Sequence, residues 1–179
     1  MSLRDITAIA LFAAFIVVLG LAPPVFVPFF PAVPISLHSM GPILAGACLG
    51  SRRGFYAVAL FWLLLAAGLA FAGGSTGPAA FLGPMGGYII GFGLAALVIG
   101  SAYQRRPHPN IAQEFCFMAA GGIIALYAAG ISWLITVTSL SLPQALALNS
   151  IFLPGDTAKI ILCLIIRRRL ARTAPQAFR

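Results

Sequence analysis

The stretch Leu49-Gly50-Ser51-Arg52-Arg53-Gly54 decides the fold, because it places two arginines between two apolar segments. Further arginines also stand at the ends of apolar segments, whereas the connections at 22–38, 72–83 and 139–155 contain no arginine or lysine. Positive charge in alternate connections is typical of a multi-pass membrane protein, in which the arginine-bearing connections face the cytosol. The arginines of this pattern are Arg4, Arg52, Arg53, Arg105, Arg106, Arg167, Arg168, Arg169 and Arg172.

Composition supports the same class of protein. Hydrophobic residues make up 61% of the chain and charged residues 8%, whereas about a quarter of the residues of a soluble domain are charged. We therefore predict an all-α integral membrane protein, a single domain over 1–179 with six transmembrane helices in one bundle and both termini cytosolic. The approximate spans are 5–21, 36–49, 54–71, 86–103, 111–137 and 156–171.

The net charge of +8 does not indicate a nucleic-acid-binding protein. The arginines form short clusters beside apolar segments, where they suit the anionic headgroups of cytosolic lipids. The cysteines lie within apolar segments without a paired spacing, which favours a role as small hydrophobic residues over disulfides or metal ligands. They are Cys48, Cys116 and Cys163.

Asp156 and Lys159 form an ionisable pair inside the sixth apolar segment. The helix from Asp156 to Ile166 is about 16 Å long, so Asp156 lies about halfway through the membrane core. We expect Asp156 to cap a helix start there, with Lys159 on the same face. Ionisable residues at this depth indicate a functional site, here one for a small carboxylic acid. Alternatively, the two charges only pair with each other and stabilise a broken helix.

Other candidate ligand contacts are glycines and polar residues near the expected outer side. Gly86 and Gly87 open the fourth segment, where glycine permits the close approach of a helix or of a ligand. Ser36 and His38 stand at the outer mouth of the second segment, and Asn149 precedes the sixth. Each of these three could form a hydrogen bond with a polar ligand.

Two segments carry predictions about packing. The proline-rich stretch 23–34 cannot form a regular helix, yet it is apolar, so we expect a lid on the outer face. Ala10 and Ala14 are four residues apart in the first segment. Small residues at this spacing favour close contact with another helix, within the bundle or in a partner protein.

The order of the motifs resembles the BioY-type proteins, the biotin-binding S components of energy-coupling-factor (ECF) transporters. The similarity covers nearly the whole chain, and the intact Pro-Gly-Asp-x-x-Lys block makes it specific. The motifs are Val33-Pro34-Ile35-Ser36-Leu37-His38, Leu44-Ala45-Gly46, Leu49-Gly50-Ser51-Arg52-Arg53-Gly54, Ala72-Gly73-Gly74, Gly83-Pro84-Met85-Gly86-Gly87-Tyr88-Ile89-Ile90-Gly91-Phe92 and Phe152-Leu153-Pro154-Gly155-Asp156-Thr157-Ala158-Lys159.

The resemblance implies a six-helix protein of the bacterial plasma membrane that binds biotin from the outer side and uses no cofactor. It implies a transmembrane coupling protein and two cytosolic ABC-type ATPases as partners, with Ala10 and Ala14 facing the coupling protein. Ser36, His38 and Met85 depart from the family pattern, which has threonine, glutamine and threonine or serine there.

The resemblance also assigns Asp156 and Lys159 to the biotin site. The carboxylate of biotin suits Lys159, its ureido N–H groups suit an acceptor such as Asp156 or Asn149, and its ring suits apolar walls such as Tyr88. The expected substrate-binding residues are Asp156, Lys159, Tyr88, Gly86, Gly87, Ser36, His38 and Asn149.

Two other functions remain open from the sequence. The chain has no Gly-Lys-Ser/Thr phosphate-binding motif, so ATP hydrolysis requires partners. A chain that works alone would be a facilitated or proton-coupled transporter of biotin or a related carboxylate. The remote alternative is an intramembrane enzyme, in which a serine and His38 would supply nucleophile and base.

Overall fold

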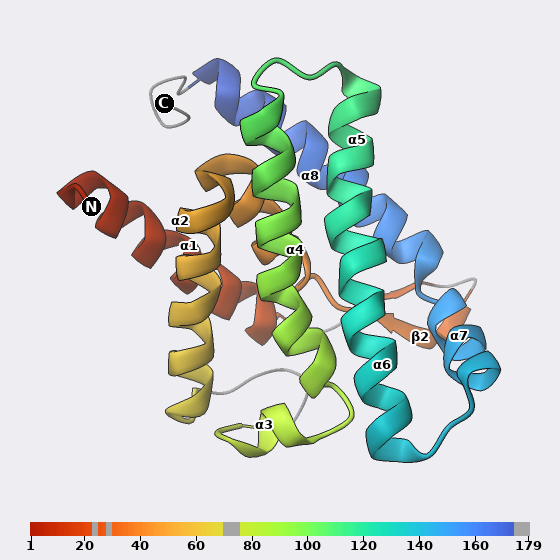
Figure 1. Ribbon diagram of the computed structural model, residues 1–179. Helices are drawn as coiled ribbons and strands as arrows, with labels where there is room; N and C mark the ends of the chain where they lie inside the picture. Colours follow the sequence, from red (N-terminus) through yellow and green to blue (C-terminus); the bar gives the residue numbers. More distant parts are fainter. Residues whose placement is uncertain (23–24, 28–29, 70–75, 174–179) are drawn as a thin grey trace.

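Eight α-helices, one π-helix and a two-stranded β-hairpin occur in the part of the chain that the computed structural model describes, residues 1–22, 25–27, 30–69 and 76–173 (Figure 1). Their bounds are α1 Leu3–Leu21, β1 Val25–Val27, β2 Phe30–Ile35, α2 Met40–Ala66, α3 Ala79–Leu82, α4 Gly86–Arg105, α5 Ile111–Ala119, the π-helix η1 Ala120–Ala125, α6 Leu126–Thr138, α7 Leu142–Ser150 and α8 Leu153–Thr173.

Helix α1 has clear start and stop signals. The hydroxyl of Ser2 accepts a hydrogen bond from the backbone N–H of Asp5, and the Asp5 carboxylate accepts one from the N–H of Ser2. This capping box satisfies two backbone donors that a helix start leaves open. The helix ends at Leu21, just before two consecutive prolines in the sequence, which cannot continue a helix.

The proline-rich stretch contains a short antiparallel hairpin, which the sequence did not predict. Val25 of β1 pairs with Ile35 of β2, and the register shifts between Phe26 and Val27. Both strands are edge strands, where proline is tolerated because its missing N–H breaks no second ladder. Residues 23–24 and 28–29 of the expected lid lie outside the described residues.

Helix α2 is interrupted at Gly50, whose φ of 80° and ψ of −178° suit only glycine. A side chain at Gly54 would lie 2.9 Å from the carbonyl oxygen of Ala45, although nine residues of continuous helix would separate them by about 13 Å. The two arms of α2 therefore fold back on each other (Figure 1). They overlap the expected segments 36–49 and 54–71, but residues 36–39 form a turn and the helix ends at Ala66.

Helix α4 lies at the centre of the packing, and small residues bring its backbone close to α2. A side chain at Gly100 would meet the backbone nitrogen of Ser51 at 2.2 Å, and one at Gly46 would meet the carbonyl oxygen of Ala96 at 2.7 Å. Such contacts let helices pack tightly in lipid, where apolar burial alone gives little driving force. The large buried side chains of α4 are Ile89, Phe92, Ile99 and Tyr103.

Within the described part of the chain, four helical segments are long and apolar enough to cross a membrane: α1, α2, α4 and the helix that runs from Ile111 to Thr138 through η1. Helices α7 and α8, bent by 53° relative to each other, form a fifth candidate. Six crossings result only if the two arms of α2 each cross. The number of spans therefore stays a prediction.

A buried ionic cluster joins four helices at the arginine-bearing end of the molecule. The Glu114 carboxylate, on α5, accepts hydrogen bonds from Arg167 at 2.8 Å and from the Tyr103 hydroxyl at 3.1 Å, and pairs with Arg168 at 2.9 Å. Arg167 also donates to the carbonyl of Ala47, and its guanidinium lies 4.0 Å from the centre of the Tyr103 ring. Glu114 thus holds the ends of α4, α5 and α8 against α2.

Candidate functional site

The centre of the candidate site is the pair of Asp156 and Lys159 in the first turns of α8. The Lys159 ammonium lies 2.5 Å from Oδ1 of Asp156, and both side chains are largely buried, with 11% and 13% of their surfaces exposed. The helix begins at Leu153, and the Asp156 N–H already donates to the carbonyl of Phe152. The expectation that Asp156 caps the helix is therefore wrong, but both residues share one face as expected.

All three N–H groups of Lys159 have acceptors. Besides Asp156, the ammonium donates to the backbone carbonyl of Ser36 at 3.0 Å and to the hydroxyl of Ser39 at 3.2 Å. Ser36 follows β2 and Ser39 precedes α2, so Lys159 joins α8 to the turn between the hairpin and α2. Because an ammonium has three donors, a ligand carboxylate can bind Lys159 only in exchange for one of these contacts.

Tyr127, near the start of α6, is the second side-chain partner of Asp156. Its hydroxyl donates to Oδ2 of Asp156, so each carboxylate oxygen has one protein donor. Tyr127 is not among the site residues expected from the sequence. The sequence did contain a signal for this role. Tyr127 stands near the middle of a long apolar segment, whereas tyrosines of membrane proteins are enriched at the membrane–water interface. A buried tyrosine hydroxyl usually has a hydrogen-bond partner.

Tyr88 and Asn149 form a second polar pair. The Tyr88 hydroxyl donates to Oδ1 of Asn149, and the Asn149 amide nitrogen donates to the carbonyl of Ala145 at 2.8 Å. Asn149 is buried on α7. A side chain at Gly130 would lie within 2.4 Å of three Tyr88 ring atoms, so the glycine lets the ring lie against α6. The structure thus brings together two of the expected site residues from distant segments.

Gly86 and Gly87 are engaged in close helix packing. A side chain at Gly86 would meet the carbonyl oxygen of Phe81 at 1.9 Å, and one at Gly87 would meet Cβ of Trp133 at 2.2 Å. These contacts account for both glycines without a ligand. Their role in binding stays a prediction.

Ser36 and His38 lie in different surroundings. Ser36 is exposed, and its hydroxyl accepts a hydrogen bond from the backbone N–H of His38 at 3.3 Å. The His38 ring is buried instead of standing at the mouth, and lies edge-on to Phe61 and Phe92 at centroid distances of 5.0 and 4.9 Å. His38 therefore belongs to an aromatic cluster beside the turn, and its contact with a ligand stays a prediction.

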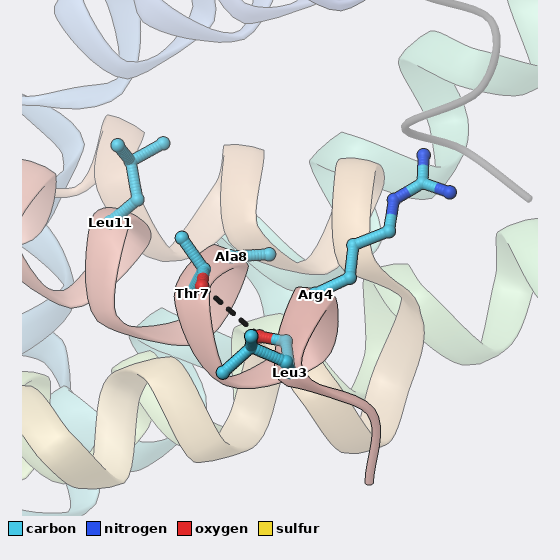
Figure 2. A pocket seen from close by; sticks show the side chains of 5 residues that line it. All are labelled: Leu3, Arg4, Thr7, Ala8 and Leu11. Carbon is cyan, nitrogen blue, oxygen red and sulfur yellow. Dashed lines mark hydrogen bonds between the residues drawn. The ribbon is translucent and has the colours of Figure 1, made fainter.

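An open hollow on α1 contains none of these residues. Figure 2 shows its lining and the hydrogen bond from the Thr7 hydroxyl to the carbonyl of Leu3. The hollow is apolar and shallow, which suits a lipid chain or a neighbouring helix better than a polar ligand. Ala10 and Ala14 are exposed and follow Thr7 and Leu11 by three residues, on the same side of the helix. The lining residues are Leu3, Arg4, Thr7, Ala8 and Leu11.

Comparison with known proteins gives the family. The model of the BioY family matches residues 1–176. This chain belongs to the BioY family. It is 41% identical to the biotin transporter BioY of Rhizobium etli over 175 residues, which cover 94% of this chain and 93% of that protein. It is also 41% identical to the biotin transporter BioY of Rhodobacter capsulatus over 185 residues, covering 97% and 96% of the two chains.

A solved structure extends the likeness to the whole fold. The crystal structure of the S-component for biotin from an ECF-type ABC transporter superposes with a TM-score of 0.87 at 34% identity, and all of each chain is covered. The chain is therefore a helical, multi-pass membrane protein of a transport family and not an enzyme. These findings confirm the family and the helical class predicted from the sequence.

Proposed function

We propose that this chain captures biotin from the outer side of the bacterial plasma membrane and delivers it inward together with an ATP-driven coupling module. The observation that carries the proposal is the Asp156–Lys159 pair, held largely buried in the membrane-spanning part of a BioY-family chain. An unpaired charge costs about 3 kcal/mol or more inside the membrane, so ionisable residues at this depth indicate a functional site. The relatives named above are biotin transporters.

The two polar pairs suit the two ends of biotin. Its carboxylate and its ureido group lie at opposite ends of the molecule, whereas Asp156 and Lys159 are in contact with each other. One extended biotin therefore cannot place one end on each. We assign the carboxylate to Lys159 with the Ser39 hydroxyl, and the ureido group to Asn149 of the second pair, with Asp156 holding Lys159 in place. The neutral amide of Asn149 offers both a donor and an acceptor, as the ureido group requires.

We further propose that the chain crosses the membrane six times with both ends in the cytosol. The fold-back at Gly50 supports two crossings by α2, with Arg52 and Arg53 at the turn between them. Asp5 pairs with Arg53 at 2.9 Å, which ties the start of α1 to that same turn. Figure 1 shows the end of α4 and the end of α8 at one end of the molecule. The arginine-bearing ends then face one side, as the positive-inside rule requires.

Equilibrium binding of labelled biotin to the detergent-purified chain tests the capture function. We expect selective binding in the nanomolar range, about 12 kcal/mol, with competition by desthiobiotin and none by an unrelated vitamin. No binding at micromolar biotin would contradict the proposal. The departures at Ser36, His38 and Met85 would then point to another small carboxylate as the ligand.

Uptake assays separate the ATP-driven from the solitary mode of transport. We propose a transmembrane coupling protein and two cytosolic ABC-type ATPases as partners, with Ala10 and Ala14 contacting the coupling protein. Cells that produce the chain with these partners are expected to accumulate biotin, and cells that produce the chain with ATPases impaired in hydrolysis are not. Equal uptake in both would favour the solitary transporter instead. Ala10→Leu tests the proposed contact with the coupling protein, because the larger side chain fills that contact without touching the biotin site.

A further inference from the structure

We propose that Tyr127 is a positioning residue that holds the Asp156 carboxylate in the orientation that biotin binding requires, and that the π-helix η1 sets Tyr127 in place. This inference rests on the proposed function. It assigns a role to a residue that the sequence motifs of the family resemblance do not include.

The first support is that the two carboxylate oxygens of Asp156 have different donors. Oδ1 faces the Lys159 ammonium, and Oδ2 accepts the hydrogen bond of the Tyr127 hydroxyl. Rotation of the carboxylate would break both contacts, so the two donors fix its plane. Each oxygen keeps a further lone pair as acceptor. Asp156 is thereby held fixed against Lys159, the only adjacent cation among the described residues, so it sets the position of the ammonium to which the biotin carboxylate is assigned.

The second support is the helix that carries Tyr127. Its buried side repeats every four residues. On a regular helix of 3.6 residues per turn, each such step drifts about 40° around the axis. The wider turn of a π-helix offsets part of this drift, so the same side of the helix packs against α4 before, at and after η1. The buried positions at this spacing are Glu114, Met118, Gly122, Leu126 and Gly130, and Gly121 and Ile131 are buried beside them.

Close contacts hold the π-helix where it is. A side chain at Gly121 would lie 2.8 Å from the carbonyl oxygen of Ala95, and one at Gly122 would lie 2.6 Å from Ile43. The widened turn thus rests against α4 and α2. On one side of it, Glu114 reaches Arg167 of α8, and on the other Tyr127 reaches Asp156 of the same helix. π-helical turns within α-helices occur frequently at functional sites.

The test compares Tyr127→Phe with Tyr103→Phe. Both substitutions remove a tyrosine hydroxyl that donates to a largely buried carboxylate, but Tyr103 donates to Glu114 at the other end of α8. We expect Tyr127→Phe to raise the Kd for biotin about tenfold, as for the loss of one hydrogen bond to a charged group. Tyr103→Phe is expected to lower the ligand-free Tm and to leave the Kd unchanged.

Tyr127→Phe in an Asp156→Asn background tests whether Tyr127 affects biotin binding through Asp156. If Tyr127 acts through Asp156, the two effects are not additive, and Tyr127→Phe changes the Kd little in that background. An unchanged Kd of the single variant, or a full tenfold effect on top of Asp156→Asn, would overturn the inference. Should Asp156→Asn bind no biotin at millimolar concentration, the comparison with Tyr103→Phe decides alone. Biotin binding by the unmodified chain with no effect of Tyr127→Phe would leave the proposed function standing, whereas no binding by the unmodified chain would overturn both.

Discussion

Lys159→Ala is expected to raise the Kd for biotin by tenfold or more. The substitution removes the cation assigned to the carboxylate of biotin and leaves Asp156 with Tyr127 as its remaining side-chain donor among the described residues. It also breaks the link from α8 to Ser36 and Ser39. An uncompensated charge at this depth costs about 3 kcal/mol or more. Equilibrium binding of labelled biotin to the purified variant measures the change.

Arg169→Ala is the matched control for charge. It removes a cation from the same helix, but Arg169 is exposed and lies outside the candidate site. We expect it to retain the affinity of the unmodified chain. Full affinity of Lys159→Ala would contradict the assigned role and leave the pair of Asp156 and Lys159 as a purely structural contact.

Glu114→Gln is expected to lower the Tm of the ligand-free protein by roughly 10 °C. The variant keeps the shape of the side chain but removes the negative charge that faces Arg167 and Arg168. Only 3% of the Glu114 side chain is exposed. Removing one partner of a buried ion pair typically costs about 3–5 kcal/mol, and each kcal/mol shifts the Tm of a protein of this size by about 2–4 °C. Thermal unfolding in detergent measures the change.

The matched comparison is Asp5→Asn, which removes an acid from the more exposed pair with Arg53. Exposed ion pairs contribute little to stability, so its Tm is expected to stay close to that of the unmodified chain. Both variants are expected to bind biotin normally once folded, because neither residue touches the candidate site. Equal melting of Glu114→Gln and the unmodified chain would show that the cluster does not hold the helix ends together.

The helical membrane class and the central pair could be predicted because each depends on local composition. Arginine clusters beside apolar segments, such as Arg52-Arg53, gave the class, and the three-residue spacing put Asp156 and Lys159 on one face. The start of α8 was misplaced by three residues. Pro154 offered a correction, because proline is favoured in the first turn of a helix, and the helix indeed begins at Leu153.

Features that depend on contacts between distant segments could not be predicted. The prolines of the hairpin excluded a helix, but the pairing of Val25 with Ile35 carries no local signal. The π-helix shifts the side of the helix on which the residues after it stand, so a regular helical pattern does not place Tyr127 at Asp156. The burial of His38 depends on aromatic rings from two other parts of the chain, Phe61 and Phe92.

A crystal structure of the chain with biotin bound would locate both ends of the ligand. We expect the biotin carboxylate to lie within hydrogen-bond distance of the Lys159 ammonium, which then gives up one of its present acceptors. The ureido group is expected to lie against Asn149. Biotin bound at another place, with Lys159 still bonded to Asp156, Ser36 and Ser39, would contradict this assignment.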